Sequence, residues 1–401
     1  MVRQNEPLIE RFLSVGRNIS LNPRMREPEK NLKLFEQFSV ELFNTKIIEI
    51  YSSNVFPETI KFKSGEQFLI WDSSYWNIFY NIIIMYFMAI NAETPALCEW
   101  IKQRLEAEIY YFMSLKTWDE TKLSIEFSRS YHELINKEIQ VQTTMGQLES
   151  YSKYVYEVTF IAKVFCLFHE LNHMDNFKQS KVFSSKLETL TELFRITNQI
   201  FQEDATFLSQ LREHYSEKEI FDALLQITEH KNSNLEIELT CDLAALNDTV
   251  DFFEKIWTDL SNEAIFSRVN EVLIVFNSIN FALTQTYRYW YFNYQFFSDR
   301  ISSEKLHKKI EHTNQEAILR YILSDITKSM CVYSLYGEKM DEILNTDQYG
   351  LRFQAENAFI EDIADIINRK ENLEKMYVNV KSYKNVSEEK LESLRNILLD
   401  W

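Results

Sequence analysis

Apolar residues recur at helical spacing in two segments of the chain. The segment 154–168 reads YVYEVTFIAKVFCLF, and its apolar residues lie three or four positions apart, at Val158, Ile161, Ala162 and Phe165. The segment 234–247 reads NLEIELTCDLAALN, where Leu239 and Leu243 lie four positions apart and Ala245 is a further apolar residue. Such spacing predicts amphipathic helices. We therefore expect two helices here, each with one face in the interior.

Helix-breaking residues are rare beyond the first quarter of the chain. The last of the 5 prolines is Pro95, and a long stretch without proline is typical of helix. Few strands are expected. Residues 59–62 and 67–72 would form a hairpin, and residues 123–130 and 138–145 alternate with a period of two. The sequence thus predicts a mainly α protein with a small β-sheet, an α+β fold.

The longest apolar run, residues 75–90, contains Asn77 and Asn81. It falls short of the roughly 20 apolar residues that a membrane-spanning helix requires. A buried core helix without membrane insertion is therefore favoured. The residues that could cap its start are Asp72, Ser73 and Ser74.

Composition narrows the function classes. The 401 residues carry a net charge of -17, which argues against nucleic acid and against an anionic membrane surface as partners, since both bind basic patches. No apolar secretion signal is found in residues 1–30. The dispersed cysteines indicate reduced thiols and a cytoplasmic location: Cys98, Cys166, Cys241 and Cys331.

One motif points to a chemistry. Residues 169–173 read H-E-L-N-H, an H-E-x-x-H string on the first amphipathic helix. Residues four apart lie about 40° from each other around a helix, so His169 and His173 project to one side, as a Zn²⁺ site needs. Glu170 lies on the adjoining flank, where it can act on a water as general base. The alternative is a pair of core histidines that bind backbone carbonyls.

The position of the third metal ligand distinguishes the classes of zinc protease. Asn176 and Gln179 stand where metzincins carry glycine and histidine, which excludes that class. Downstream, the segment 238–242, E-L-T-C-D, resembles the E-x-x-A-D helix of gluzincin metallopeptidases. Among gluzincins, an H-E-x-x-H helix followed by a later acidic helix is similar to the arrangement in bacterial phage-exclusion proteases and other bacterial proteases. The resemblance assigns no subfamily.

The resemblance implies roles for the acidic residues. It would make Glu238 the third zinc ligand and Asp242 the carboxylate that orients a ligand histidine. The two acids share one helix face, and metal-bound imidazoles normally donate to a carboxylate. Glu236 points about 200° away, but an error of register would exchange its role with that of Glu238. Cys241 replaces the usual alanine and could in principle ligate the metal.

The expected function is zinc-dependent hydrolysis of peptide bonds in a protein or peptide substrate. The zincin-like core would span residues 121–250, between an N-terminal region, 1–120, with a hairpin and apolar helix, and a helical C-terminal region, 251–401. The substrate, the oligomeric state and the oxyanion donor are left open, the last among several tyrosines and His214, His230 and His307.

Two other classes remain open. Glu170-x-x-His173 and Glu304-x-x-His307 are both E-x-x-H pairs, which in a helical bundle could hold two iron ions. An inactive helical interaction protein is the other alternative.

Overall fold

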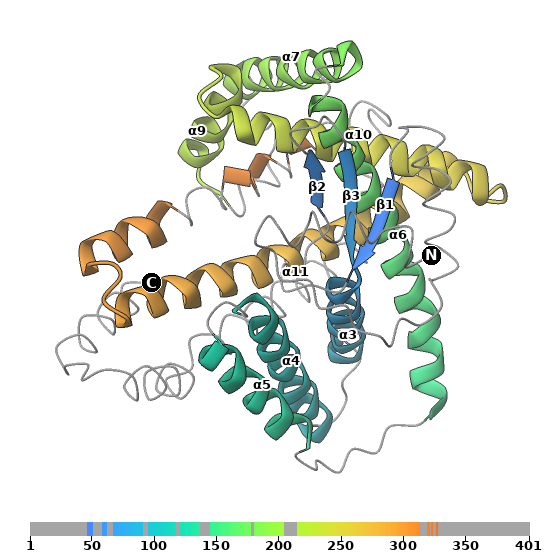
Figure 1. Ribbon diagram of the computed structural model, residues 1–401. Helices are drawn as coiled ribbons and strands as arrows, with labels where there is room; N and C mark the ends of the chain where they lie inside the picture. Colours follow the sequence, from blue (N-terminus) through green and yellow to red (C-terminus); the bar gives the residue numbers. More distant parts are fainter. Residues whose placement is uncertain are drawn as a thin grey trace. The chain divides into compact units, whose positions relative to one another are not determined.

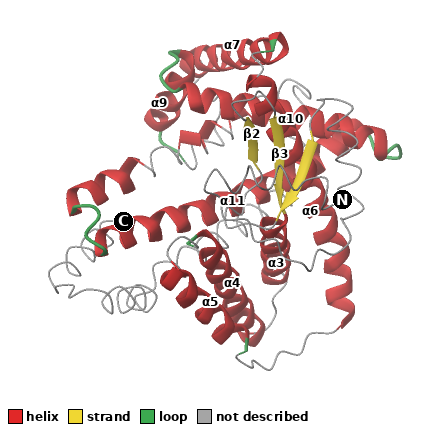
Figure 2. Ribbon diagram, viewed as in Figure 1, coloured by secondary structure: helices red, strands yellow, loops and turns green. Residues whose placement is uncertain are grey.

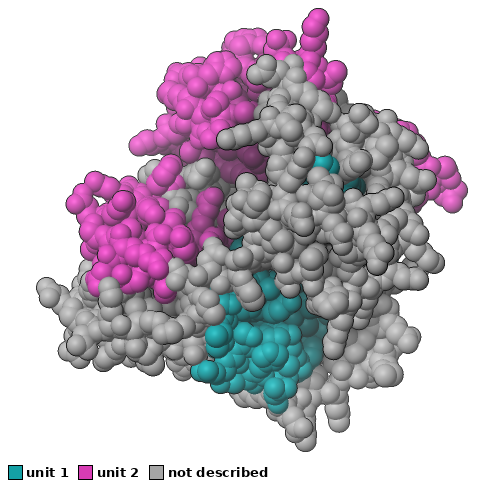
Figure 3. Space-filling view, in the orientation of Figure 1, with its two compact units in different colours: residues 1–160, 362–383 teal, residues 161–361, 384–401 magenta. Residues whose placement is uncertain are grey.

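The computed structural model is mainly helical, as expected (Figures 1 and 2). It describes residues 46–50, 58–61, 67–90, 95–117, 121–136, 145–177, 180–203, 215–312, 319–320, 322–323 and 326–327. The chain forms two compact units, residues 1–160 with 362–383 and residues 161–361 with 384–401 (Figure 3). The division falls within one long helix, and the three-part organisation expected from the sequence stays a prediction.

The strands of the first unit form a sheet in the order β1-β3-β2. Strand β2 (Glu58–Lys61) pairs antiparallel with β3 (Gln67–Asp72), in the expected hairpin, and β1 (Lys46–Ile50) pairs parallel with β3. The central strand is apolar on both faces, because Phe68, Leu69, Ile70 and Trp71 are all buried.

Helix α3 (Ser73–Ile90) continues directly from β3 and contains the apolar run. Asp72 begins it, since its Oδ1 accepts a hydrogen bond of 3.0 Å from the backbone N–H of Ser74. Ile78, Phe79 and Ile82 are fully buried, which confirms the expected core helix. Within the described part of the chain, no helix is long and apolar enough to cross a membrane.

The strand predicted at residues 123–130 is wrong, because these residues belong to helix α5 (Thr121–Ile135), which packs on α4 (Pro95–Lys116). The helix turns Ser124, Phe127 and Tyr131 towards α4, at a spacing of three and four residues. Ile125, whose position in the alternation suggested a strand, is 51% exposed. Packing along a helical face therefore decided the structure. Residues 138–144 of the other predicted strand lie outside the described residues.

The second unit is helical where it is described. Helix α6 (Met145–Phe177) enters it from the first unit and is followed by α7 (Lys181–Glu203), α9 (Glu217–Thr228), α10 (Ser233–Ile256) and α11 (Asn262–Phe297). The expected helical region after residue 250 is described as far as residue 312 and then in short pieces.

A shared core holds α10 against α7 and α9. Its buried members include Leu190 and Phe194 of α7, Ile220 of α9 and Leu239 of α10. Because Leu239 is fixed in this core, the adjacent positions of α10 are held at defined orientations around the helix axis.

Candidate metal centre

Helix α6 places both histidines of the H-E-x-x-H motif on one side. The residues of the preceding turns, among them Val158, Ile161 and Phe165, are buried as the apolar pattern predicts. His169 and His173 continue this face, and their side chains are 12% and 13% exposed. The helix therefore presents two imidazoles at the edge of a packed interior, where each needs a polar partner.

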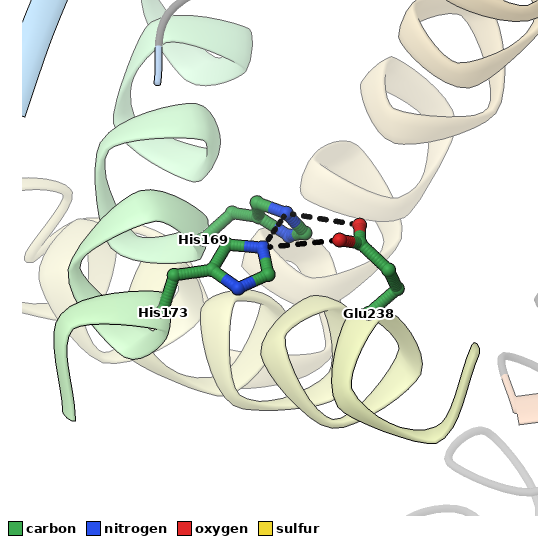
Figure 4. Close-up of side chains that lie close together, drawn as sticks. All are labelled: His169, His173 and Glu238. Atoms are coloured by element: carbon green, nitrogen blue, oxygen red, sulfur yellow. Dashed lines mark hydrogen bonds and ion pairs between the residues drawn. The ribbon is translucent and has the colours of Figure 1, made fainter. Parts of the chain in front are cut away.

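Helix α10 brings Glu238 to these imidazoles. Figure 4 shows the three side chains, two from α6 and one from α10, pointing toward one another. The Nε2 atoms of His169 and His173 are 3.0 Å apart. A Glu238 oxygen lies 3.6 Å from Nε2 of His169, and the other lies 3.4 Å from Nε2 of His173.

These separations fit one tetrahedral ion. Metal–ligand distances of about 2.0–2.1 Å at the tetrahedral angle put neighbouring ligand atoms about 3.3 Å apart. Among the described residues, His169, His173 and Glu238 form the group whose ligand atoms all lie within 4.8 Å of one another. Two imidazole nitrogens and one carboxylate are also the donor set of many zinc sites with an open fourth position. The residues present therefore fit a metal ion.

Asp242 occupies the position expected of the orienting carboxylate. Its Oδ1 lies 2.8 Å from Nδ1 of His169, on the side of the ring opposite the Nε2 that faces Glu238. This contact favours the tautomer with the proton on Nδ1, which leaves the Nε2 lone pair for a metal.

Glu236, the alternative third ligand, points elsewhere. It is buried, and its Oε1 lies 3.2 Å from Nδ1 of His230. In the structure, α10 thus has the register in which Glu238 faces the histidines.

The acids set the charge of the site. Burial alone would lower the pKa of His169, but Asp242, followed by Glu238 and Glu170, raises it above the ordinary value. For His173 the direction is opposite, because burial and the neighbouring His169 lower its pKa. The arrangement therefore stabilises one positive charge at the point where the nitrogens and the carboxylate meet. A divalent cation would be stabilised there by the same acids.

Both carboxyl groups are ionised at neutral pH. Burial alone would raise the pKa of Glu238 and of Asp242. The hydrogen bond and charge of His169 and the charge of Arg320 outweigh burial at Glu238 and lower its pKa. At Asp242 the charges of Arg320 and His169 lower the pKa to about 2. Both acids are thus in the form that binds a cation or accepts a hydrogen bond.

Arg320 is the residue of this site that sequence reasoning missed. Its guanidinium lies 3.1 Å from Oε2 of Glu238 and 3.6 Å from Oδ2 of Asp242. No motif surrounds it in the sequence, and nothing in the local pattern assigns it to the centre. Only the tertiary structure brings it beside the two acids.

Glu170, the expected general base, is half-buried on α6 beside His169. Its negative charge helps to raise the pKa of His169 and also raises the pKa of the thiols of Cys166 and Cys241. These effects place its carboxylate in the electrostatic neighbourhood of the centre, and its role as general base stays a prediction.

Cys241 is not part of the metal group. It is fully buried, and burial, followed by Asp242 and Glu238, raises the pKa of its thiol. A thiolate, the form that binds metal, is therefore disfavoured at this position.

The remaining candidates lie apart from the triad. Glu304 and His307 are exposed, and Glu304 pairs with Lys308 at 2.7 Å, so this second E-x-x-H pair adds no ligand to the group. This placement disfavours a centre with two iron ions. His230, a possible oxyanion donor, is held at Glu236, and His214 lies outside the described residues.

Comparison with known proteins adds no family assignment. No protein-family model, no curated protein and no solved structure matches this chain. The function is therefore inferred from the chemistry of the site itself.

Proposed function

We propose that this protein is a zinc-dependent metallopeptidase in which His169, His173 and Glu238 hold the metal. The observation that carries the proposal is the meeting of two Nε2 atoms and one carboxylate at separations of 3.0–3.6 Å. The order of these ligands along the chain, with H-E-x-x-H on one helix and glutamate on a later helix, supports a gluzincin type and a zincin-like core.

Each residue of the site has a distinct task in this proposal. Zinc held by His169, His173 and Glu238 would lower the pKa of a bound water and would polarise a carbonyl group. Glu170 accepts the proton from the attacking water and returns it to the departing amine. Asp242 holds the ring of His169, and Arg320 keeps Glu238 and Asp242 ionised and in place. The side chain of Glu238 is 35% exposed, so water can reach the centre from this side.

A protein or peptide in the cytoplasm is the proposed substrate. The described cysteines, Cys98, Cys166 and Cys241, are free thiols, as in proteins of a reducing compartment. The acidic chain argues against nucleic acid as a substrate, since phosphate backbones are bound by basic surfaces.

The proposal is tested by comparing metal content and proteolysis in the same preparations. The wild type should contain one zinc per chain, and its induced expression should generate new protein termini that proteomics detects. Glu170→Gln should keep the zinc and lose hydrolysis by about 10²-fold to 10⁴-fold, as expected when a general base is removed. His169→Ala should lose the metal itself, because it removes a ligand.

Glu133→Gln is the matched control. Glu133 also follows a histidine on a helix, but it is exposed on α5, so its substitution should leave both zinc and proteolysis unchanged. A wild type without metal would refute the metal centre. Zinc together with equal cleavage by wild type and Glu170→Gln would refute the mechanism, and zinc without any cleavage would leave a structural metal site.

A further inference from the structure

A fully buried amide lies directly behind the proposed metal centre. Asn172, within the H-E-x-x-H string, has no exposed surface, and its immediate neighbour Leu171 is equally buried. The amide Nδ2 donates to the backbone oxygen of Phe168 at 2.8 Å and to Oδ2 of Asp248 at 3.2 Å. The amide Oδ1 accepts from Nζ of Lys186 at 2.8 Å. All hydrogen-bonding directions of a carboxamide but one acceptor site are thus used.

These bonds join three helices. Asn172 belongs to α6, Lys186 to α7 and Asp248 to α10, and Nζ of Lys186 is also 4.0 Å from Oδ2 of Asp248. The amide of Asn172 is fully buried, where a polar group is costly unless it is paired, whereas the side chains of Lys186 and Asp248 are 32% and 33% exposed. An apolar residue at position 172 would avoid this cost, which suggests that the polar group serves the geometry of the helices.

The network would maintain the positions of the proposed metal ligands. Asn172 immediately precedes His173 and follows His169 by three residues, so any rotation of α6 about its axis moves all three side chains together. Ligand atoms must be held to a few tenths of an ångström for a metal to bind well. The bond to Asp248 fixes Asn172 to α10, the helix that carries Glu238. The bond to Lys186 fixes it to α7 as well.

We propose that Asn172 is a positioning residue that holds α6 in the rotation at which His169 and His173 face Glu238, through its bonds to Asp248 and Lys186. This inference rests on the proposed metal centre and extends it to the residues behind the ligands. It predicts that breaking the amide network weakens metal binding although no ligand is removed.

Cobalt binding provides the test, because the visible spectrum of Co²⁺ reports on the geometry of its ligands. Asn172→Leu, of similar size, should bind Zn²⁺ and Co²⁺ about 10-fold to 100-fold more weakly, with an altered Co²⁺ absorption band. Lys186→Met should act in the same direction and tests the same link if Asn172→Leu does not fold. Lys181→Met, at an exposed lysine on the same helix, should match the wild type.

Two further variants separate positioning from general stability. Leu306→Ala removes a fully buried side chain from the helix at residues 303–312, which carries neither a ligand nor a member of the amide network, so it should lower thermal stability yet leave the cobalt spectrum and the metal affinity unchanged. The double variant Asn172→Asp with Asp248→Asn swaps the two side chains and so keeps one amide, one carboxylate and one ammonium. It should bind metal more tightly than Asn172→Asp alone, since it restores a donor opposite an acceptor.

The outcomes distinguish this inference from the proposed function. If the wild type binds no metal, the metal centre is wrong, and the positioning role is wrong with it. If the wild type binds metal but Asn172→Leu and Lys186→Met match its affinity and cobalt spectrum, only the positioning role is wrong. Equal losses of affinity in Leu306→Ala and Asn172→Leu would also overturn it, because the network would then be merely structural.

Discussion

Replacing Glu238 by alanine is expected to weaken zinc binding by about 10²-fold to 10³-fold. The apparent binding free energy of structural zinc sites is about 10–16 kcal/mol. Divided equally among four ligands, it amounts to about 2.5–4 kcal/mol for each ligand. Each 1.4 kcal/mol corresponds to tenfold in affinity. The structure assigns this share to Glu238 because its two oxygens lie 3.6 Å and 3.4 Å from the imidazole nitrogens.

Glu236→Ala is the matched control for this substitution. Glu236 lies on the same helix only two residues earlier, but its carboxylate is held at His230 and faces away from the triad. Its loss should leave zinc affinity unchanged. Any effect should be on stability, since Glu236 is buried.

The assay is a competition titration against a chromophoric zinc chelator, with circular dichroism to check that both variants are folded. If Glu238→Ala retains the wild-type affinity while Glu236→Ala loses zinc, the register of α10 and the assignment of the third ligand are wrong. If neither variant changes the affinity, the metal does not bind at this triad.

Three further predictions concern other residues. Asp242→Asn should weaken zinc affinity about 10-fold to 100-fold in the same titration, because it loosens His169; an unchanged affinity would refute the orienting role. Burial raises the pKa of the Glu108 carboxyl group to about 7, although a hydrogen bond from Asn81 opposes the shift. Because this pKa is higher than in the unfolded chain, the neutral form of Glu108 favours folding. The free energy of unfolding should therefore fall as pH rises from about 4.5 through 7, by about 3 kcal/mol at most. In urea unfolding, Glu108→Gln should not show this fall. Equal pH dependence of the two proteins would contradict the burial of Glu108. Ser216 caps α9, and Ser216→Ala should destabilise the protein by about 0.5–2 kcal/mol in thermal unfolding, whereas no change would show that water replaces the cap.

The long helices could be predicted with the most success. The buried face of α6 and the core helix α3 both follow from apolar residues at recognisable spacing over many turns. The segment 123–130 could not be predicted in this way, because a short alternating run fits both a strand and one face of a helix. Contacts of Phe127 and Tyr131 with α4 decided in favour of the helix.

At the site, the ligand candidates could be identified from local spacing in the sequence. The offset of four residues between His169 and His173 sets both on one side of any helix, and the same offset pairs Glu238 with Asp242. These relations are local, since they depend only on helical geometry, and they hold wherever the two helices lie.

Which residues from distant segments meet depends on the packing of the helices. Glu238, and not Glu236, faces the histidines, because the core around Leu239 fixes the rotation of α10. The packing also brings Arg320 to the two acids and joins Asn172 to Asp248. These contacts link residues far apart in the sequence, and their formation depends on how whole helices pack. No local pattern encodes that packing, so the local sequence gives the ligands while the packed core sets the distances between them.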